Sequence, residues 1–202
     1  MKKEILMKKI ELIFLGIMIF TISISQISAK PITVDKLPSS TSEFIKLRNE
    51  IAKSPEGGAV TWLIAMLKYS QDQKMGLQFM TIALSRDNLQ QGAVYKGYKP
   101  HRSFNYHLKR FRRSLYWPKA YVIGTNPKNG YKFNWPASFE LTRNRYSGKE
   151  SSGKIKVFVK TYGVRPRPMM LKRNNRGYWK AGGISSFFLG VQTPVKKVDD
   201  DL

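Results

Sequence analysis

The spacing of apolar residues changes once along this chain, near Pro118, and this change constrains the fold more than any other feature. Before Pro118, apolar residues recur at intervals of three and four, which is typical of amphipathic helices. After it they alternate with polar residues, which indicates strands with one buried face. We therefore predict an α+β fold in which N-terminal helices pack on a C-terminal antiparallel sheet of about five strands.

Four helices are expected before Pro118. The clearest start signal is Ser54-Pro55-Glu56, which offers a capping hydroxyl, a proline where no N–H is needed and an acid at the positive end of the helix. The residues that follow, Ala59 to Leu67, are apolar on almost every side, so we expect this helix to lie in the core. The predicted helices cover residues 43–53, 55–70, 72–84 and 103–115.

The strand candidates are separated by Asn, Gly and Pro turns. In the third candidate, Ile155, Val157 and Val159 point to one face while lysines alternate with them, so one face of the sheet is buried and the other is basic. Residues 174–177, Asn-Asn-Arg-Gly, predict a tight hairpin between the last two strands. The predicted strands cover residues 119–123, 139–143, 154–162, 167–173 and 178–181.

The N-terminal 29 residues have the pattern of a secretory signal peptide. Four lysines precede an apolar run from Leu12 to Ile24, and small residues end the segment at Ala29. An uncleaved membrane anchor is the alternative, but a run of about 13 apolar residues is shorter than the roughly 20 that span a bilayer. We expect cleavage, export to the periplasm or the medium, and no transmembrane span afterwards.

The rest of the chain is divided by composition. Residues 30–42 are rich in Pro, Ser and Thr and predict a flexible leader. A single α+β domain is expected over residues 43–195, followed by an acidic-ended tail over residues 196–202. The chain has no cysteine, so this domain must be stabilised by burial and not by disulfides.

The charge is strongly positive, at +23 for the whole chain. Removal of the signal segment takes away four lysines and two glutamates, which leaves +21 on the mature domain. Such a charge favours an anionic partner. The alternative is that the charge is spread over the surface with no dedicated ligand.

Catalytic patterns are missing from the sequence. Acids are scarce: none occurs between Asp87 and Glu140, so a pair of carboxylates for acid–base chemistry is not expected. The two histidines, His101 and His107, are six residues apart and cannot share a metal as an i, i+4 pair does. We predict no catalytic residues, no metal and no cofactor.

Cations and aromatic residues are interleaved between Tyr95 and Arg113. This pattern is compatible with nucleic acid, but export makes an anionic glycan, a lipid headgroup or an acidic protein the more suitable partner. A different class of function, an enzyme or small-molecule carrier with a pocket in the concavity of the sheet, would use residues such as His101 and Glu140. The candidate anion-binding residues are Lys96, Lys99, Arg102, Lys109, Arg110, Arg112 and Arg113.

Several segments resemble an exported bacterial domain family of unknown function, over about residues 41–195. They are Ser54 to Ala59, Tyr95 to Pro100, Thr142 to Gly148, Lys154 to Thr161, and Gly177 to Lys180 followed by Ser185-Ser186. The resemblance implies no site residues, because the family carries no assigned activity. The Tyr178-Trp179-Lys180 strand is also similar to the last strands of NTF2-like domains, which implies helices wrapped around a curved antiparallel sheet.

Overall fold

The computed structural model describes residues 27–28 and 30–196. The predicted signal peptide, except for Ile27 and Ser28, lies outside the described residues, as does most of the predicted tail. The α-helices are α2 (Thr41–Ile51), α3 (Pro55–Gln71), α4 (Gln73–Ala83) and α5 (Phe104–Phe111). The strands are β1 (Ile27–Ser28), β2 (Ile32–Val34), β3 (Leu89–Tyr95), β4 (Tyr98–Pro100), β5 (Ala137–Phe139), β6 (Leu141–Arg143), β7 (Lys154–Val159), β8 (Arg167–Arg173) and β9 (Trp179–Gly183). The 3₁₀ helices are η1 (Arg86–Asn88), η2 (Trp117–Tyr121), η3 (Glu150–Ser152) and η4 (Ser185–Phe188).

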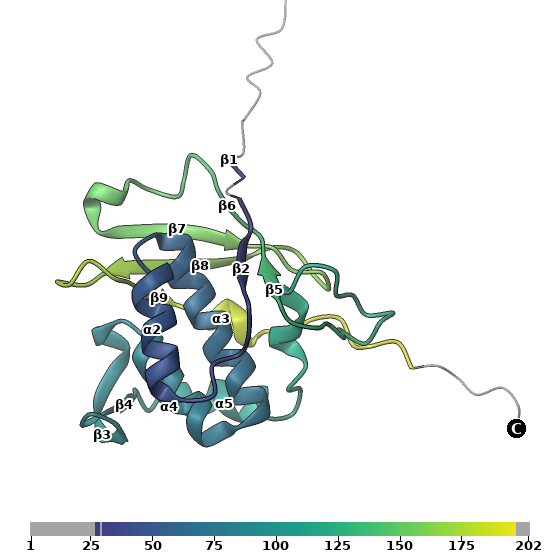
Figure 1. Cartoon of the computed structure of the whole chain (residues 1–202), viewed down its shortest axis with the longest axis horizontal. Helices are drawn as coiled ribbons and strands as arrows, with labels where there is room; N and C mark the ends of the chain where they lie inside the picture. Colours follow the sequence, from purple (N-terminus) through teal and green to yellow (C-terminus); the bar gives the residue numbers. More distant parts are fainter. Residues whose placement is uncertain (1–26, 29, 197–202) are drawn as a thin grey trace, which may run out of the picture.

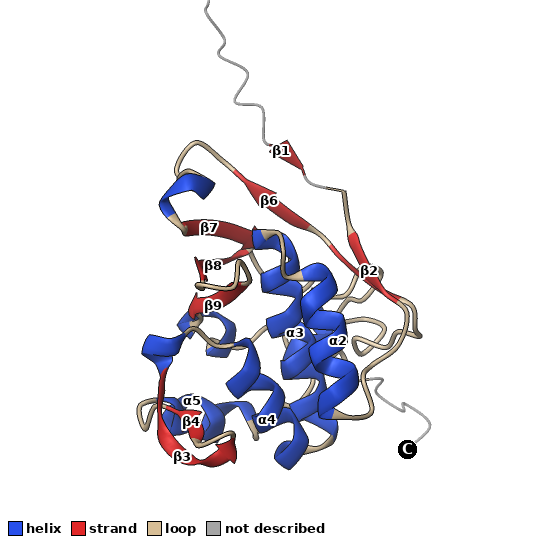
Figure 2. Ribbon diagram, turned by 60° about the vertical axis from the view of Figure 1, so that its left-hand side comes forward, coloured by secondary structure: helices blue, strands red, loops and turns tan. Residues whose placement is uncertain are grey.

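The helices and the main sheet form two layers, which confirms the predicted α+β class (Figure 1). The sheet has the order β1-β6-β7-β8-β9, and its strands are antiparallel. Figure 2 shows β6 to β9 at the upper left of the molecule, α2 and α3 to their right, and α4 and α5 below them. Two small sheets, β2-β5 and β3-β4, lie outside this main sheet.

Side-chain caps begin helices α2, α3 and α4. The side chains of Ser40, Ser54 and Asp72 each accept a hydrogen bond from the backbone N–H three residues later. Helix α3 is buried along almost its whole length, as its apolar sequence predicts. It is the element that packs on the sheet, whereas α2 and α4 pack on α3.

The buried face of the sheet is formed by the residues that alternation predicts. Ile155, Val157 and Val159 of β7 are fully buried, and Leu171 of β8 and Ala181 of β9 continue the same face. Helix α3 approaches β9 closely at Gly58, where a Cβ atom would lie 2.6 Å from the carbonyl oxygen of Trp179. Only glycine fits at this position. Gly57 is required by a different contact, because a Cβ atom there would lie 1.7 Å from the carbonyl oxygen of Ile51.

Three sequence-based expectations need correction. Residues 119–123, predicted as a strand, contain the end of η2, because Pro118 begins a 3₁₀ turn; only Val122 bridges to Phe139. The predicted helix 103–115 is limited to Phe104–Phe111. Residues 86–99 have a composition typical of a loop with a short extended piece around residues 93–98, but they form η1 and a longer β3-β4 hairpin.

The leader expected over residues 30–42 contributes to the fold. Its Ile32–Val34 segment forms β2, which pairs with β5 and buries Val34. The alternation of Ile, Thr and Val lets one face of this short strand pack inward. Among the helices of residues 27–28 and 30–196, none combines the length and apolar character needed to cross a membrane.

Candidate functional site

A cleft with a volume of about 960 Å³ lies between α2, the end of α4, the β3-β4 hairpin and the turn that joins β8 to β9. Its lining contains five cations, three tyrosines and no carboxylate. The cations are Arg48, Arg86, Lys96, Arg176 and Lys180. The tyrosines are Tyr95, Tyr98 and Tyr178. We refer to this site as the cationic cleft.

Each cation of the cationic cleft comes from a different element. Arg48 lies in the last turn of α2, Arg86 in η1 and Lys180 in β9. Lys96 and Arg176 lie in hairpin turns, where Lys96 has a φ of 44° before Gly97. In the part of the chain that the structure describes, none of the five has a carboxylate within 4.0 Å.

The cations lie over the tyrosine rings of the same cleft. The guanidinium carbon of Arg86 is 4.3 Å from the ring centre of Tyr98, and that of Arg48 is 4.7 Å from the ring centre of Tyr178. The amine of Lys96 lies 5.8 Å from the ring centre of its neighbour Tyr95. A guanidinium group that rests on a ring keeps its N–H edge for hydrogen bonds, so stacking orients the arginines without neutralising them.

Lys180 is the most enclosed cation of the cleft. Its amine donates a hydrogen bond to the carbonyl oxygen of Ile82, in the last turn of α4, where carbonyl groups lack helical partners. Burial, with a smaller effect of the Arg48 charge, lowers the pKa of Lys180 to about 7. A bound anion would favour the charged amine, so Lys180 can take up a proton when an anion enters.

The residues predicted from sequence fall into two separate places. Lys96 lines the cationic cleft, whereas Lys99 and Arg102 are exposed and lie outside its lining. Lys109, Arg110 and Arg113 surround a hollow of about 280 Å³ with Tyr106, and Arg112 is exposed nearby. The predicted run of cations is therefore not one surface.

Sequence reasoning missed four of the five cleft cations, namely Arg48, Arg86, Arg176 and Lys180. Two of them had a usable signal, because Arg176 lies in the predicted hairpin turn and Lys180 follows Tyr178 in the predicted last strand. Arg48 and Arg86 had none, since nothing local indicates that a helix end and a 3₁₀ turn face the same cleft.

The residues suggested for an enzyme do not come together. Glu140 accepts a hydrogen bond from the amine of Lys160 at 2.8 Å and lies outside the cleft lining. His101 Nδ1 is 3.0 Å from the hydroxyl of Ser103. His107 stacks on Phe188 with ring centres 5.0 Å apart, and burial lowers the pKa of its imidazole.

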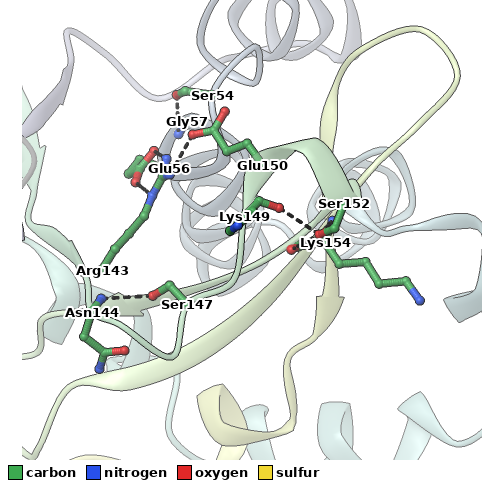
Figure 3. Close-up of polar contacts among 10 residues, drawn as sticks. All are labelled: Ser54, Glu56, Gly57, Arg143, Asn144, Ser147, Lys149, Glu150, Ser152 and Lys154. Carbon is green, nitrogen blue, oxygen red and sulfur yellow. Dashed lines mark hydrogen bonds and ion pairs between the residues drawn. The ribbon is translucent and has the colours of Figure 1, made fainter.

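A second charged cluster lies at the start of α3, where Arg143 is paired with two glutamates (Figure 3). The guanidinium group of Arg143 in β6 donates to both carboxylate oxygens of Glu56, with 2.6 Å from Nη2 to Oε2. Its Nη1 donates to Glu150 Oε1 at 2.6 Å. These hydrogen bonds raise the pKa of Arg143. We call these three residues the paired cluster.

The paired cluster connects segments that resemble the exported domain family of unknown function. Ser54 caps α3 and Glu56 of the same segment holds Arg143, while Asn144 begins a turn in which its N–H donates to the Ser147 hydroxyl at 3.0 Å (Figure 3). The carbonyl of Ser147 then accepts from the N–H of Lys156 at 2.8 Å. Segments 54–59, 142–148 and 154–161 are thus joined by structural contacts, whereas segments 95–100 and 177–180 contribute residues to the cationic cleft.

Comparison with known proteins adds a family to this geometry. No curated protein and no solved structure matches the chain, so the similarity to NTF2-like domains rests on the sequence segment alone. A family of domains described as a domain of unknown function, DUF6935, matches residues 36–195. This range includes α2 to η4, the cationic cleft and the paired cluster. The chain therefore belongs to the DUF6935 family.

Proposed function

We propose that this chain is an exported, non-enzymatic domain that binds an anionic partner in the cationic cleft. The observation that supports this proposal is the lining of the cleft, which holds five cations and no carboxylate. Like charges held around one hollow repel each other, and an anion in the hollow removes that repulsion. The export part of the proposal rests on the basic and apolar pattern of the N-terminal residues.

The paired cluster provides an internal reference for this argument. Arg143 has two carboxylate partners and is committed to holding β6 against α3. In the cleft, Arg48 rests on the ring of Tyr178, and Arg86 rests on the ring of Tyr98 and donates one long hydrogen bond from Nη1 to the carbonyl oxygen of Leu89, at 3.4 Å. Neither arginine is paired with a carboxylate of the described residues, so most of their N–H groups are available for a ligand. Carboxylate, sulfate and phosphate groups all accept the paired hydrogen bonds that a guanidinium group donates.

The test compares two variants of equal charge. The cleft variant carries Arg48→Gln, Arg86→Gln and Arg176→Gln, and the matched control carries Lys109→Gln, Arg110→Gln and Arg113→Gln on and just after α5. Binding of the mature protein to heparin is measured over a salt series, with circular dichroism to verify folding. We expect the cleft variant to lose at least about tenfold in affinity, because one charge-assisted hydrogen bond contributes about 1.5–3 kcal/mol.

The control sharpens the interpretation. We expect the α5 variant to lose only the modest, salt-dependent affinity that a change of net charge brings. Equal losses in both variants would show that binding is non-specific and would reject the cleft. A loss confined to the α5 variant would move the site to the hollow beside Tyr106. Export is tested separately by separating the cytosolic, periplasmic and secreted fractions and sequencing the N-terminus of the protein in each. Protein that is confined to the cytosol with an intact Met1 would contradict export.

A second candidate function is the binding of a small anionic molecule, which the volume of the cleft favours. About 960 Å³ is within the range of pockets that enclose small ligands. Calorimetry with galacturonic acid and with citrate tests it. If either small acid binds tightly, and a polymer of the same acidic groups binds no more tightly, the result would support a carrier of small anions and not the binding of a larger partner.

A further inference from the structure

The open face of the main sheet carries a row of lysines that meets the cationic cleft. In the strand register Lys154 of β7 lies opposite Lys172 of β8, and Lys172 lies opposite Lys180 of β9. These three residues alternate with the buried Ile155, Leu171 and Ala181, so they belong to the face that α3 does not cover. Lys180 also lines the cleft, so the row and the cleft share a residue.

This row is unfavourable without a ligand. Like charges directly opposite each other on neighbouring strands destabilise a sheet. Of the three lysines of the row, only Lys172 has an acidic partner among the described residues, namely Asp87, whose pKa is lowered mainly by that hydrogen bond. With strands about 4.8 Å apart, the row extends the cationic surface by about 10 Å beyond Lys180. The strand spacing of about 4.8 Å is close to the length of one sugar unit in a polysaccharide.

We propose that the cleft and the row together bind one linear acidic polysaccharide, with several charged sugar units in the cleft and further units across β9, β8 and β7. This inference rests on the proposed function and names its ligand. The lysines of the row continue from the cleft along a line that is longer than a small anion, and the strand register places them at regular intervals.

Two other polyanions fit this surface less well. Single-stranded nucleic acid is bound through bases that stack on free aromatic rings, but each of the three cleft tyrosines already has a cation over its ring. A lipid surface presents headgroups in a plane, whereas the cations here surround a hollow. A flexible sugar chain can enter the hollow and continue over the sheet.

The experiment uses oligogalacturonates of increasing length on the mature protein. We expect the affinity per oligomer to rise with oligomer length until the oligomer covers both the cleft and the row. Longer oligomers should bind with the same affinity. The row variant Lys154→Gln/Lys172→Gln should lose about five- to tenfold in affinity for the long oligomer and little for the monomer. The matched control Lys128→Gln/Lys132→Gln, which changes two exposed lysines outside both sites, should bind both like the wild type.

The outcomes separate this inference from the proposed function. If the row variant and the control bind the long oligomer with equal affinity, the row does not contribute to binding. The cleft would then remain as an anion site. Binding of poly-dT or of phosphatidylglycerol vesicles in preference to oligogalacturonate would overturn the polysaccharide and still support an anionic partner. Absence of binding to every polyanion would overturn both proposals.

Discussion

The paired cluster and the cationic cleft use the same kind of residue in opposite ways. In the paired cluster Arg143 lies between Glu56 and Glu150, and Glu56 is only 7% exposed. In the cleft Arg48 and Arg86 lie against tyrosine rings without any described carboxylate beside them. The comparison teaches that cation content alone says little about function. What matters is whether the fold provides each cation with an acid.

The largest effect is expected from breaking the paired cluster. Arg143→Met leaves the buried carboxylate of Glu56 without its main partner, and we expect it to lower the free energy of unfolding by about 3 kcal/mol. Urea denaturation at neutral pH measures this change. The double variant Glu56→Gln/Arg143→Met should regain much of the lost stability, because no buried charge is then left unpaired. An Arg143→Met protein as stable as the wild type would contradict the structural role of the cluster.

A smaller effect is expected from the pH dependence of Lys180. Its pKa is lowered to about 7 in the folded protein, so between pH 7 and its ordinary pKa of about 10.4 the unfolded chain binds more protons. Stability should therefore rise with pH in this range. From pH 7.5 to 9 we expect the wild type to gain about 1–2 kcal/mol relative to Lys180→Met, as measured by urea denaturation at each pH.

The chosen pH range also lies above the titration of His107. Burial lowers the pKa of His107 below its ordinary 6.5, so this imidazole is neutral from pH 7.5 upward. Parallel stability curves for the wild type and Lys180→Met would show that Lys180 stays charged in the folded protein. They would also contradict our expectation that Lys180 takes up a proton when an anion binds.

The smallest effect is expected from removing one unpaired cation. Arg176 is exposed in the turn before β9, and its charge opposes that of Arg48 in the same cleft. Arg176→Gln should raise the free energy of unfolding by about 0.3 kcal/mol through relief of repulsion, and 1 M salt should abolish the difference. Thermal unfolding at low and high salt measures both. A clear loss of stability at low salt would mean that Arg176 has a structural partner, as Arg143 has.

Elements with a strong local signal were predicted well. The start signal at Ser54 and the apolar run located α3 to within a residue, and the predicted helix over residues 72–84 matches α4 to within a residue at each end. Alternation located β7 and β8. Residues 119–123 alternate like a strand but follow Trp117-Pro118, which form a 3₁₀ turn whose side chains complete the core. Strand β2 was missed because three residues carry too little pattern without their partner β5.

The candidate site was predicted less well than the fold. Neighbouring cations along α5 suggested one basic surface, yet the helix places them around a hollow of their own with Tyr106. The cationic cleft collects Arg48, Arg86, Lys96, Arg176 and Lys180 from five elements that are up to 132 residues apart in sequence. Such a set has no local signature.

By itself, the sequence determined the two-layer α+β class, the buried course of α3, the alternation of β7 and the excess of positive charge. Each of these depends on residues that are close in the chain, where helical and strand periods act directly. Only the tertiary structure decided which cations receive an acid and which face a common hollow. The reason is that charge pairing depends on distance in space, and packing α2, α4 and two hairpins around the edge of β9 brings together residues that the chain keeps far apart.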